Sequence, residues 1–176
     1  MAVISLEEAK LYLKVDTTDD DELINALISV AERLVEKYTG RTLLTSEFVF
    51  KLDDPPGEIL IPHSPLQSVS KIEVIDDSGV ATEVAASNYY VDIDQAQQGR
   101  VRLRPGCVWP YHRGFASFVI SGSAGYGDSP DKVPTPLKTA ILLALAILYE
   151  NRGQVESQTL IDSISALCWP YRVLRI

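Results

Sequence analysis

The stretch VPTPLKTAILLALAILYENR, residues 133–152, contains the longest apolar run of the chain. Thr135 and Pro136 are typical of a helix start, as N-cap and first helical residue. Leu137 to Tyr149 is apolar at nearly every position, and this predicts a helix that is buried on all sides. A membrane span needs about 20 apolar residues, and Glu150 to Gly153 ends the run before that. We therefore expect a core helix that also contributes to a subunit interface.

Two further helices are predicted upstream of this run. Ser5 and Glu8 form a capping box that starts a short helix ending near Val15. The acidic run Asp19 to Glu22 then suits the positive end of a second helix, and Gly40 suits its left-handed C-terminus. These acids lack the alternating spacing of an EF-hand, so we expect no calcium site. The apolar positions of the second helix form one wide stripe: Leu23, Ile24, Leu27, Ile28, Ala31, Leu34, Val35 and Tyr38.

Between residues 41 and 133 the apolar period changes from helical to alternating. Short strands separated by Pro, Gly and Asp turns are predicted at 47–52, 58–61, 69–75, 89–91, 100–103 and 115–120. A polar linker from Gly153 to Thr159 leads to a last helix, Leu160 to Leu167. The predicted fold class is α+β, a small α-helical bundle with a central antiparallel β-rich insertion. Its predicted parts are a helical core (1–41 and 133–168), an insertion (42–132) and a C-terminal tail (169–176).

Composition excludes several classes of protein. The chain has 176 residues, 46% hydrophobic and 23% charged, enough to bury a core as one globular protein. Its formal charge of −8 disfavours coating of nucleic acid. Cys107 and Cys168 match no zinc or disulfide spacing, and Met1 to Leu6 lacks a signal-peptide pattern. We expect a reducing, cytoplasmic context.

No catalytic motif emerges, so we expect no enzyme, no cofactor and no metal. His63 and His112 have no nucleophile beside them and are interpreted as loop residues. The glycines between Gly122 and Gly127 lack the order of a Walker A loop and are interpreted as a strand end and a loop. The alternating Arg100, Arg102 and Arg104 place three guanidinium groups on one strand face. That face is either a solvated surface or a patch for phosphate or an acidic partner.

The C-terminal residues 168–176 are aromatic, apolar and basic, whereas chain ends are usually polar. Trp, Tyr and Arg are the residue types that most often anchor interfaces. We expect this tail to bind a partner; the alternative is a tail folded back on its own core. The candidate partner-binding residues are Trp169, Pro170, Tyr171, Arg172, Leu174 and Arg175.

The order of these blocks resembles a known family. The opening from Val3 to Asp16 is followed by a helix from Asp20 to Arg41, as in the head-tail connector (adaptor) proteins of long-tailed phages, prophages and gene transfer agents. Val133-Pro134, Tyr149-Glu150-Asn151-Arg152 and Leu167 to Arg172 are similar to the far end of that family. The insertion of about 90 residues resembles only the longer members.

The resemblance implies a structural role without catalysis. Such adaptors form a ring, commonly of about twelve subunits, between the portal and a stopper or tail-completion protein. DNA passes through the ring without specific binding, and no membrane is involved. The expected location is the head-tail interface of a virion or phage-like particle, and the host cytoplasm during assembly. The tail is then the portal-binding segment, and the candidate subunit-interface residues are Leu27, Leu34, Leu142, Leu145 and Tyr149.

Two other functions stay open from the residues alone. A β-rich module for a small molecule or glycan would use stacking faces on Tyr89, Tyr90, Trp109 and Tyr111. An enzyme would use the carboxylates of Asp92 and Asp94 or the imidazole of His112, and would show perturbed titration there.

Overall fold

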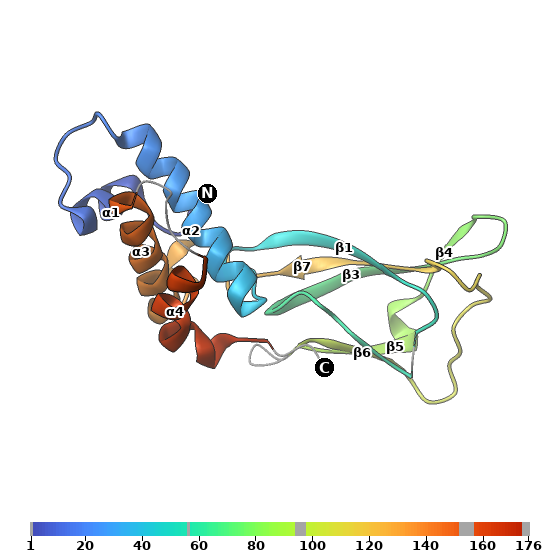
Figure 1. Cartoon of the computed structure of the whole chain (residues 1–176). Coiled ribbons are helices and arrows are strands. Elements are labelled where there is room, and N and C mark those ends of the chain that lie inside the picture. The colour runs from blue at the N-terminus through green and yellow to red at the C-terminus, as the bar shows by residue number, and fades with distance from the viewer. Residues whose placement is uncertain (1, 56, 94–97, 152–156, 174–176) are drawn as a thin grey trace. The chain divides into compact units, whose positions relative to one another are not determined.

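The computed structural model describes residues 2–55, 57–93, 98–151 and 157–173. The chain divides into two compact units. The helical unit comprises Met1–Leu44 and Gly127–Ile176, and the β-unit comprises Thr45–Tyr126. The α+β fold class predicted from the sequence is confirmed (Figure 1). Among the described residues, no helix has the length and apolar character needed to cross a bilayer.

Four α-helices build the helical unit: α1 (Leu6–Leu13), α2 (Asp21–Thr39), α3 (Thr135–Glu150) and α4 (Ser157–Cys168). Helices α2 and α3 pack against each other, and each of them also contacts α1 and α4. Two short 3₁₀ helices, η2 (Pro130–Lys132) and η3 (Trp169–Tyr171), precede α3 and follow α4. The fully buried side chains of the unit include Ile24, Ile28, Ala31, Val35, Leu137, Ala140, Ile141, Ala144, Leu145 and Ile164.

The predicted helix signals hold at α1 and α2. The Ser5 side chain accepts a hydrogen bond of 3.1 Å from the Glu8 backbone N–H. Gly40 ends α2 with φ 70°. The carboxylates at the start of α2 bind neighbouring elements: Asp21 pairs with Lys10 of α1 at 2.6 Å, and Asp20 accepts a 2.6 Å hydrogen bond from the Tyr149 hydroxyl of α3.

Two expectations for α3 are wrong. Pro134, not Thr135, is the N-cap, because the Lys138 N–H donates to the Pro134 carbonyl and so places Thr135 inside the first turn. The helix is also not buried on all sides: Leu142, Leu143, Ala146 and Ile147 are only partly buried. Helix α4 begins at Ser157, within the segment expected to be a linker.

The β-unit contains two antiparallel sheets. The four-stranded sheet has the order β1-β7-β3-β4, and the three-stranded sheet has the order β2-β6-β5. A single cluster of buried side chains draws on strands of both sheets, including Phe48, Ile72, Phe118 and Ile120 from the first and Ile59, Tyr89 and Val101 from the second. The strands are β1 (Ser46–Leu52), β2 (Glu58–Leu60), β3 (Leu66–Ile75), β4 (Ala81–Glu83), β5 (Tyr89–Asp92), β6 (Arg100–Leu103) and β7 (Phe118–Ala124).

Strand β7 extends beyond its predicted end at residue 120 and includes Gly122. The strand runs to Ala124, and Gly122 pairs with both Phe48 of β1 and Val69 of β3. A Cβ at Gly122 would lie 2.2 Å from the backbone oxygen of Ser68, closer than van der Waals contact permits. The glycine therefore lets the β3 backbone approach β7 next to the two register shifts of β3.

Candidate partner-binding surfaces

The C-terminal segment is fixed to the end of α2 by backbone contacts. Pro170 lies in the single 3₁₀ turn η3 that continues from α4. The Val173 N–H donates a 2.8 Å hydrogen bond to the carbonyl of Thr39, and Nε of the buried Arg41 donates one of 2.5 Å to the carbonyl of Tyr171. The segment up to residue 173 thus follows its own helical unit rather than projecting freely.

Its large side chains nevertheless stay accessible. Trp169 is 61% exposed. The Arg172 guanidinium lies 5.7 Å from the centre of the Trp169 ring and 5.5 Å from that of Tyr38, so a cation–π cluster holds the indole beside α2. The tail therefore has a feature of each sequence interpretation. Its backbone folds back on its own helical unit, and its Trp169 side chain stays accessible to a partner. Leu174 and Arg175 lie outside the described residues.

Beneath this segment, Cys168 is fully buried. Burial raises the pKa of its thiol to about 11, so the thiolate is scarce near neutral pH. Cys168 acts as a small apolar core residue, as the sequence predicts.

Helix α2 carries two parallel apolar stripes. Ile24, Ile28, Ala31 and Val35 are spaced i, i+4, i+7 and i+11 and form the buried stripe. The same spacing shifted by one residue gives Leu23, Leu27, Val30 and Leu34, which we call the outer stripe. Leu23 is 45% and Val30 51% exposed, while Leu27 and Leu34 are partly buried. A single helical layer leaves this second stripe without a full apolar cover.

The predicted interface residues therefore fall in different environments. Leu27 and Leu34 belong to the outer stripe, and Leu142 is partly buried on α3. Tyr149 is partly buried and donates its hydroxyl hydrogen to Asp20 in the same unit. Leu145 is 0% exposed. The expectation that it contacts another subunit is wrong, because its side chain is fully buried within its own unit.

Several exposed apolar residues were not singled out from the sequence as interface candidates. The sequence places Leu23 in the apolar stripe of the second helix and gives Val30 no role. Leu11 and Tyr12 of α1 are 81% and 44% exposed. A usable signal is present in α2, where two interleaved sets of apolar residues share one spacing and together make an apolar face wider than one stripe.

The aromatics considered for a glycan module do not face one another. Tyr89 is buried, and Trp109 packs edge-on against Phe118 with a ring separation of 5.2 Å. Tyr111 donates a hydrogen bond to Asp77, and Tyr90 lies under the guanidinium of Arg104. Each ring has its own neighbour, so the four do not share one stacking surface.

The candidate catalytic groups are held in structural contacts. The His112 ring contacts the Pro110 carbonyl through Nδ1 and the Asp54 carboxylate, at 3.2 Å, through Nε2. Asp92 forms an ion pair with Arg100 at 2.5 Å, and His63 stacks on Phe48. Asp94 lies outside the described residues. Within the described part of the chain, no three His, Cys, Asp or Glu side chains gather as a metal site.

The described residues thus combine accessible aromatic and apolar side chains with polar groups that make contacts within the chain. The profile of the family described as phage gp6-like head-tail connector protein matches residues 3–100. The chain belongs to this family, and its function is that of a structural head-tail connector. A comparison with curated proteins gives no match.

Solved structures share the fold over almost the whole chain. A chain in the virion of a native gene transfer agent (GTA) particle is 23% identical, with a TM-score of 0.81, and the match covers 99% of this chain and 91% of that one. A chain in the neck of an empty GTA particle, computed with C6 symmetry, is 22% identical, with a TM-score of 0.80 and the same coverage. A chain in the neck of a native GTA particle, computed with C12 symmetry, is 24% identical over 88% of this chain and 84% of that one, with a TM-score of 0.74.

Proposed function

We propose that this connector is a head-tail adaptor that forms a ring between the portal protein and the stopper or tail-completion protein of a phage-like particle. Family membership supports the position between head and tail. The fold it shares with a chain from a particle neck computed with C12 symmetry supports a ring of about twelve copies. The β-unit is an insertion between the two halves of the helical core (1–41 and 133–168), and residues 169–176 are the docking tail.

The portal-binding surface in this proposal is the C-terminal segment with Trp169, Pro170, Tyr171, Arg172, Leu174 and Arg175. The observation that carries it is the 61% exposure of Trp169, held in place by Arg172 and Tyr38. An exposed indole in a fixed orientation loses little side-chain entropy on binding, and a Trp-Arg pair is a frequent interface hot spot. Arg172 then meets carboxylates of the portal.

The outer stripe of α2, with Leu27 and Leu34, forms the contact between subunits, together with Leu142 and Tyr149 at the partly buried side of α3. A closed ring requires two different surfaces on each copy, and α2 and α3 supply one each. DNA passes through the ring without specific binding, since the net charge of −8 opposes adhesion to phosphates. The protein assembles in the host cytoplasm, ends at the head-tail junction and catalyses no reaction.

The test is attachment to heads that carry the portal. Deletion of residues 169–176, or the double substitution Trp169→Ala with Arg172→Ala, is expected to leave a folded protein that no longer attaches. Val49→Ser is the matched control, because Val49 is 64% exposed on the four-stranded sheet and outside the proposed surfaces. Normal attachment of the double variant, with a folded helical unit by circular dichroism, would remove the tail from the mechanism.

A further inference from the structure

The β-unit has an exposed apolar end for which portal binding gives no role. We call it the tip: the long loop 107–117, the β3–β4 turn 76–80, and Asp53 with Asp54. Its exposed apolar side chains are Val80 (58%), Val108 (80%), Tyr111 (75%) and Phe115 (76%). The loop and the turn contact each other through the hydrogen bond from Tyr111 to Asp77, and exposed apolar side chains that gather in one region are typical of an interface.

The conformation of the tip is fixed by other side chains of the same loop, which pack against the β-unit. Trp109 and His112 both pack edge-on against the buried Phe118, at ring separations of 5.2 Å and 4.9 Å. The Arg113 N–H donates a 3.1 Å hydrogen bond to the carbonyl of Ile75 at the end of β3. The loop is therefore held from within while its apolar residues face outward.

Carboxylates surround these apolar side chains. The Asp53 carboxylate accepts a 2.7 Å hydrogen bond from the Ala116 N–H, and Asp77 accepts one from the Tyr111 hydroxyl. Asp54 contacts His112, and Asp76 accepts two backbone hydrogen bonds within its own turn. The one arginine of the loop, Arg113, donates to a backbone carbonyl. Four carboxylates against one guanidinium make the tip apolar and acidic.

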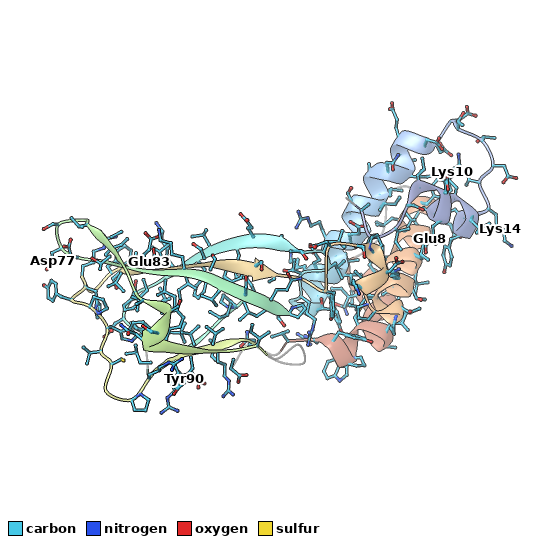
Figure 2. All side chains as sticks on the ribbon, turned by 180° about the vertical axis from the view of Figure 1, so that it is seen from behind. Glu8, Lys10, Lys14, Asp77, Glu83 and Tyr90 are labelled. Atoms are coloured by element: carbon cyan, nitrogen blue, oxygen red, sulfur yellow. The ribbon has the colours of Figure 1, made fainter. Side chains whose placement is uncertain are left out.

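A surface of opposite charge lies on the open face of the three-stranded sheet. It consists of Leu60, Tyr90, Arg100, Arg102 and Arg104, and we call it the arginine face. The strand register places Leu60 beside Arg100 and Tyr90 beside Arg102. Leu60 and Tyr90 are 48% and 52% exposed. Figure 2 shows Tyr90 on β5 and Asp77 at the β3–β4 turn, two separate places on the β-unit.

Of the three arginines, Arg100 is the one that pairs with carboxylates in the described part of the chain. Arg100 pairs with Asp92 at 2.5 Å and with Glu58 at 3.6 Å. The Arg104 guanidinium lies 4.3 Å from the Tyr90 ring centre, and its Nε donates to the Tyr89 carbonyl. Among the described residues, neither Arg102 nor Arg104 forms an ion pair with a carboxylate. Glu58 lies opposite Arg102 in the strand register but pairs with Arg100, so Arg102 and Arg104 have no carboxylate at ion-pair distance in the described part of the chain.

We propose that the tip of one copy docks on the arginine face of a second copy. Acidic and apolar groups on one surface meet basic and apolar groups on the other, so charge complementarity and apolar burial favour the same contact. Because the two surfaces differ, the contact is heterologous and repeats from copy to copy, as a closed ring requires. This inference rests on the proposed ring and identifies a contact within it made by the β-unit.

Nucleic acid fits the arginine face less well than a second copy does. Phosphate binding would engage the arginines but would leave the exposed apolar side chains of the tip without a partner. A second copy covers both surfaces at once.

The test uses two charge-reversed full-length variants. Variant F carries Arg102→Glu and Arg104→Glu, so its face and its tip are both acidic. Variant T carries Asp54→Lys and Asp77→Lys, so its tip and its face are both basic. Each variant alone is expected to associate with itself at least about tenfold more weakly than the wild type. An equimolar mixture is expected to recover association, because every F tip then meets a T face and every T tip meets an F face.

Association is measured by sedimentation velocity over a range of concentrations at low salt, and by electron microscopy of rings on portal-bearing heads. The control Lys37→Glu with Lys51→Glu changes the charge equally outside both surfaces and is expected to behave as wild type. Variants F and T that form rings as well as wild type, or a mixture no better than either variant alone, would overturn the docking. A wild-type chain that attaches to heads without forming a ring would instead contradict the proposed ring itself.

Discussion

The Arg41 side chain, just beyond the C-terminus of α2, donates a hydrogen bond of 2.5 Å from Nε to the backbone carbonyl of Tyr171, 130 residues later in the chain. Arg41 is only 5% exposed. With the bond from the Val173 N–H to the Thr39 carbonyl, it holds residues 171–173 against the end of α2. The proposed docking tail therefore starts from a fixed position at the end of the longest helix.

Substitution of Arg41 should loosen this start. In Arg41→Ala the Tyr171 carbonyl loses its donor, and an unsatisfied carbonyl costs about 1–3 kcal/mol. We expect the free energy of unfolding to fall by about that amount and amide exchange at residues 171–173 to accelerate. Chemical denaturation and hydrogen-exchange mass spectrometry measure the two effects.

Arg33→Ala is the control for Arg41→Ala. The Arg33 side chain is 83% exposed, and its 3.1 Å pair with Glu36 is a surface pair within one helix turn. Such pairs contribute about 0–1 kcal/mol. Equal loss of unfolding free energy in the two variants would show that the hydrogen bond to Tyr171 contributes no more to stability than a surface ion pair.

Glu32 of α2 makes stability depend on pH. Its carboxylate accepts hydrogen bonds from the N–H groups of Val3, at 2.6 Å, and Ile4, at 3.3 Å. Burial raises the pKa of Glu32 above its ordinary value of 4.5, against the opposing effect of these two bonds. Since the folded state holds this proton more tightly than the unfolded chain, the stabilisation is complete below pH 4.5 and is lost as pH rises through the folded pKa.

Glu32→Gln removes the charge but keeps an acceptor oxygen for Val3 and Ile4. We expect the variant to gain stability relative to wild type as pH rises from 4.5 towards neutrality, because only wild type then buries a charge. Urea denaturation of both proteins at a series of pH values measures the difference. A difference that moves in favour of wild type over this interval would mean that the two hydrogen bonds outweigh burial.

Gly122 should tolerate no side chain. A Cβ at this position would lie 2.2 Å from the Ser68 carbonyl oxygen and 2.9 Å from Cζ of Phe48. Because the first neighbour is backbone in a paired strand, relief requires a shift of β3. Gly122→Ala is expected to cost about 1–3 kcal/mol.

A Cβ at Gly114 would meet no atom within 4 Å, so Gly114→Ala is the control and should change stability by less than about 0.5 kcal/mol. Thermal denaturation of both variants tests the contrast.

Local signals made most of the fold predictable. The Ser5 N-cap, the Gly40 C-terminus and the alternation at Arg100 to Leu103 each depend on a few neighbouring residues, and each is present in the structure. Strand β4 was missed because all three of its residues are exposed and show no alternation. The sequence interprets Gly122 to Gly127 as a strand end and a loop, but it does not show why residue 122 is a glycine, because the reason is the close Ser68 carbonyl, a contact between distant residues.

The candidate surfaces were less predictable than the fold. Composition pointed to the C-terminal aromatics, and Trp169 is indeed exposed. Composition cannot show whether an apolar residue of a helix faces its own core, so Leu145 was proposed for an interface although it is fully buried. The tip depends on contacts between residues 53–54, 76–80 and 107–117, which lie far apart in the sequence.

The outer stripe of α2 leads to the last prediction, which compares two adjacent positions. Val30 is 51% exposed in the outer stripe, and Ser29 is its exposed neighbour outside both stripes. Val30→Asp and Ser29→Asp introduce the same charge one residue apart, and exposed substitutions change stability by only about 0.5 kcal/mol. Their effects on the fold should therefore be alike by circular dichroism.

A carboxylate at Val30 would be desolvated by a neighbouring subunit, whereas one at Ser29 would stay in water. We expect Val30→Asp, and not Ser29→Asp, to prevent ring formation on portal-bearing heads as counted by electron microscopy. Rings of normal number with Val30→Asp would mean that the outer stripe faces solvent in the assembled particle.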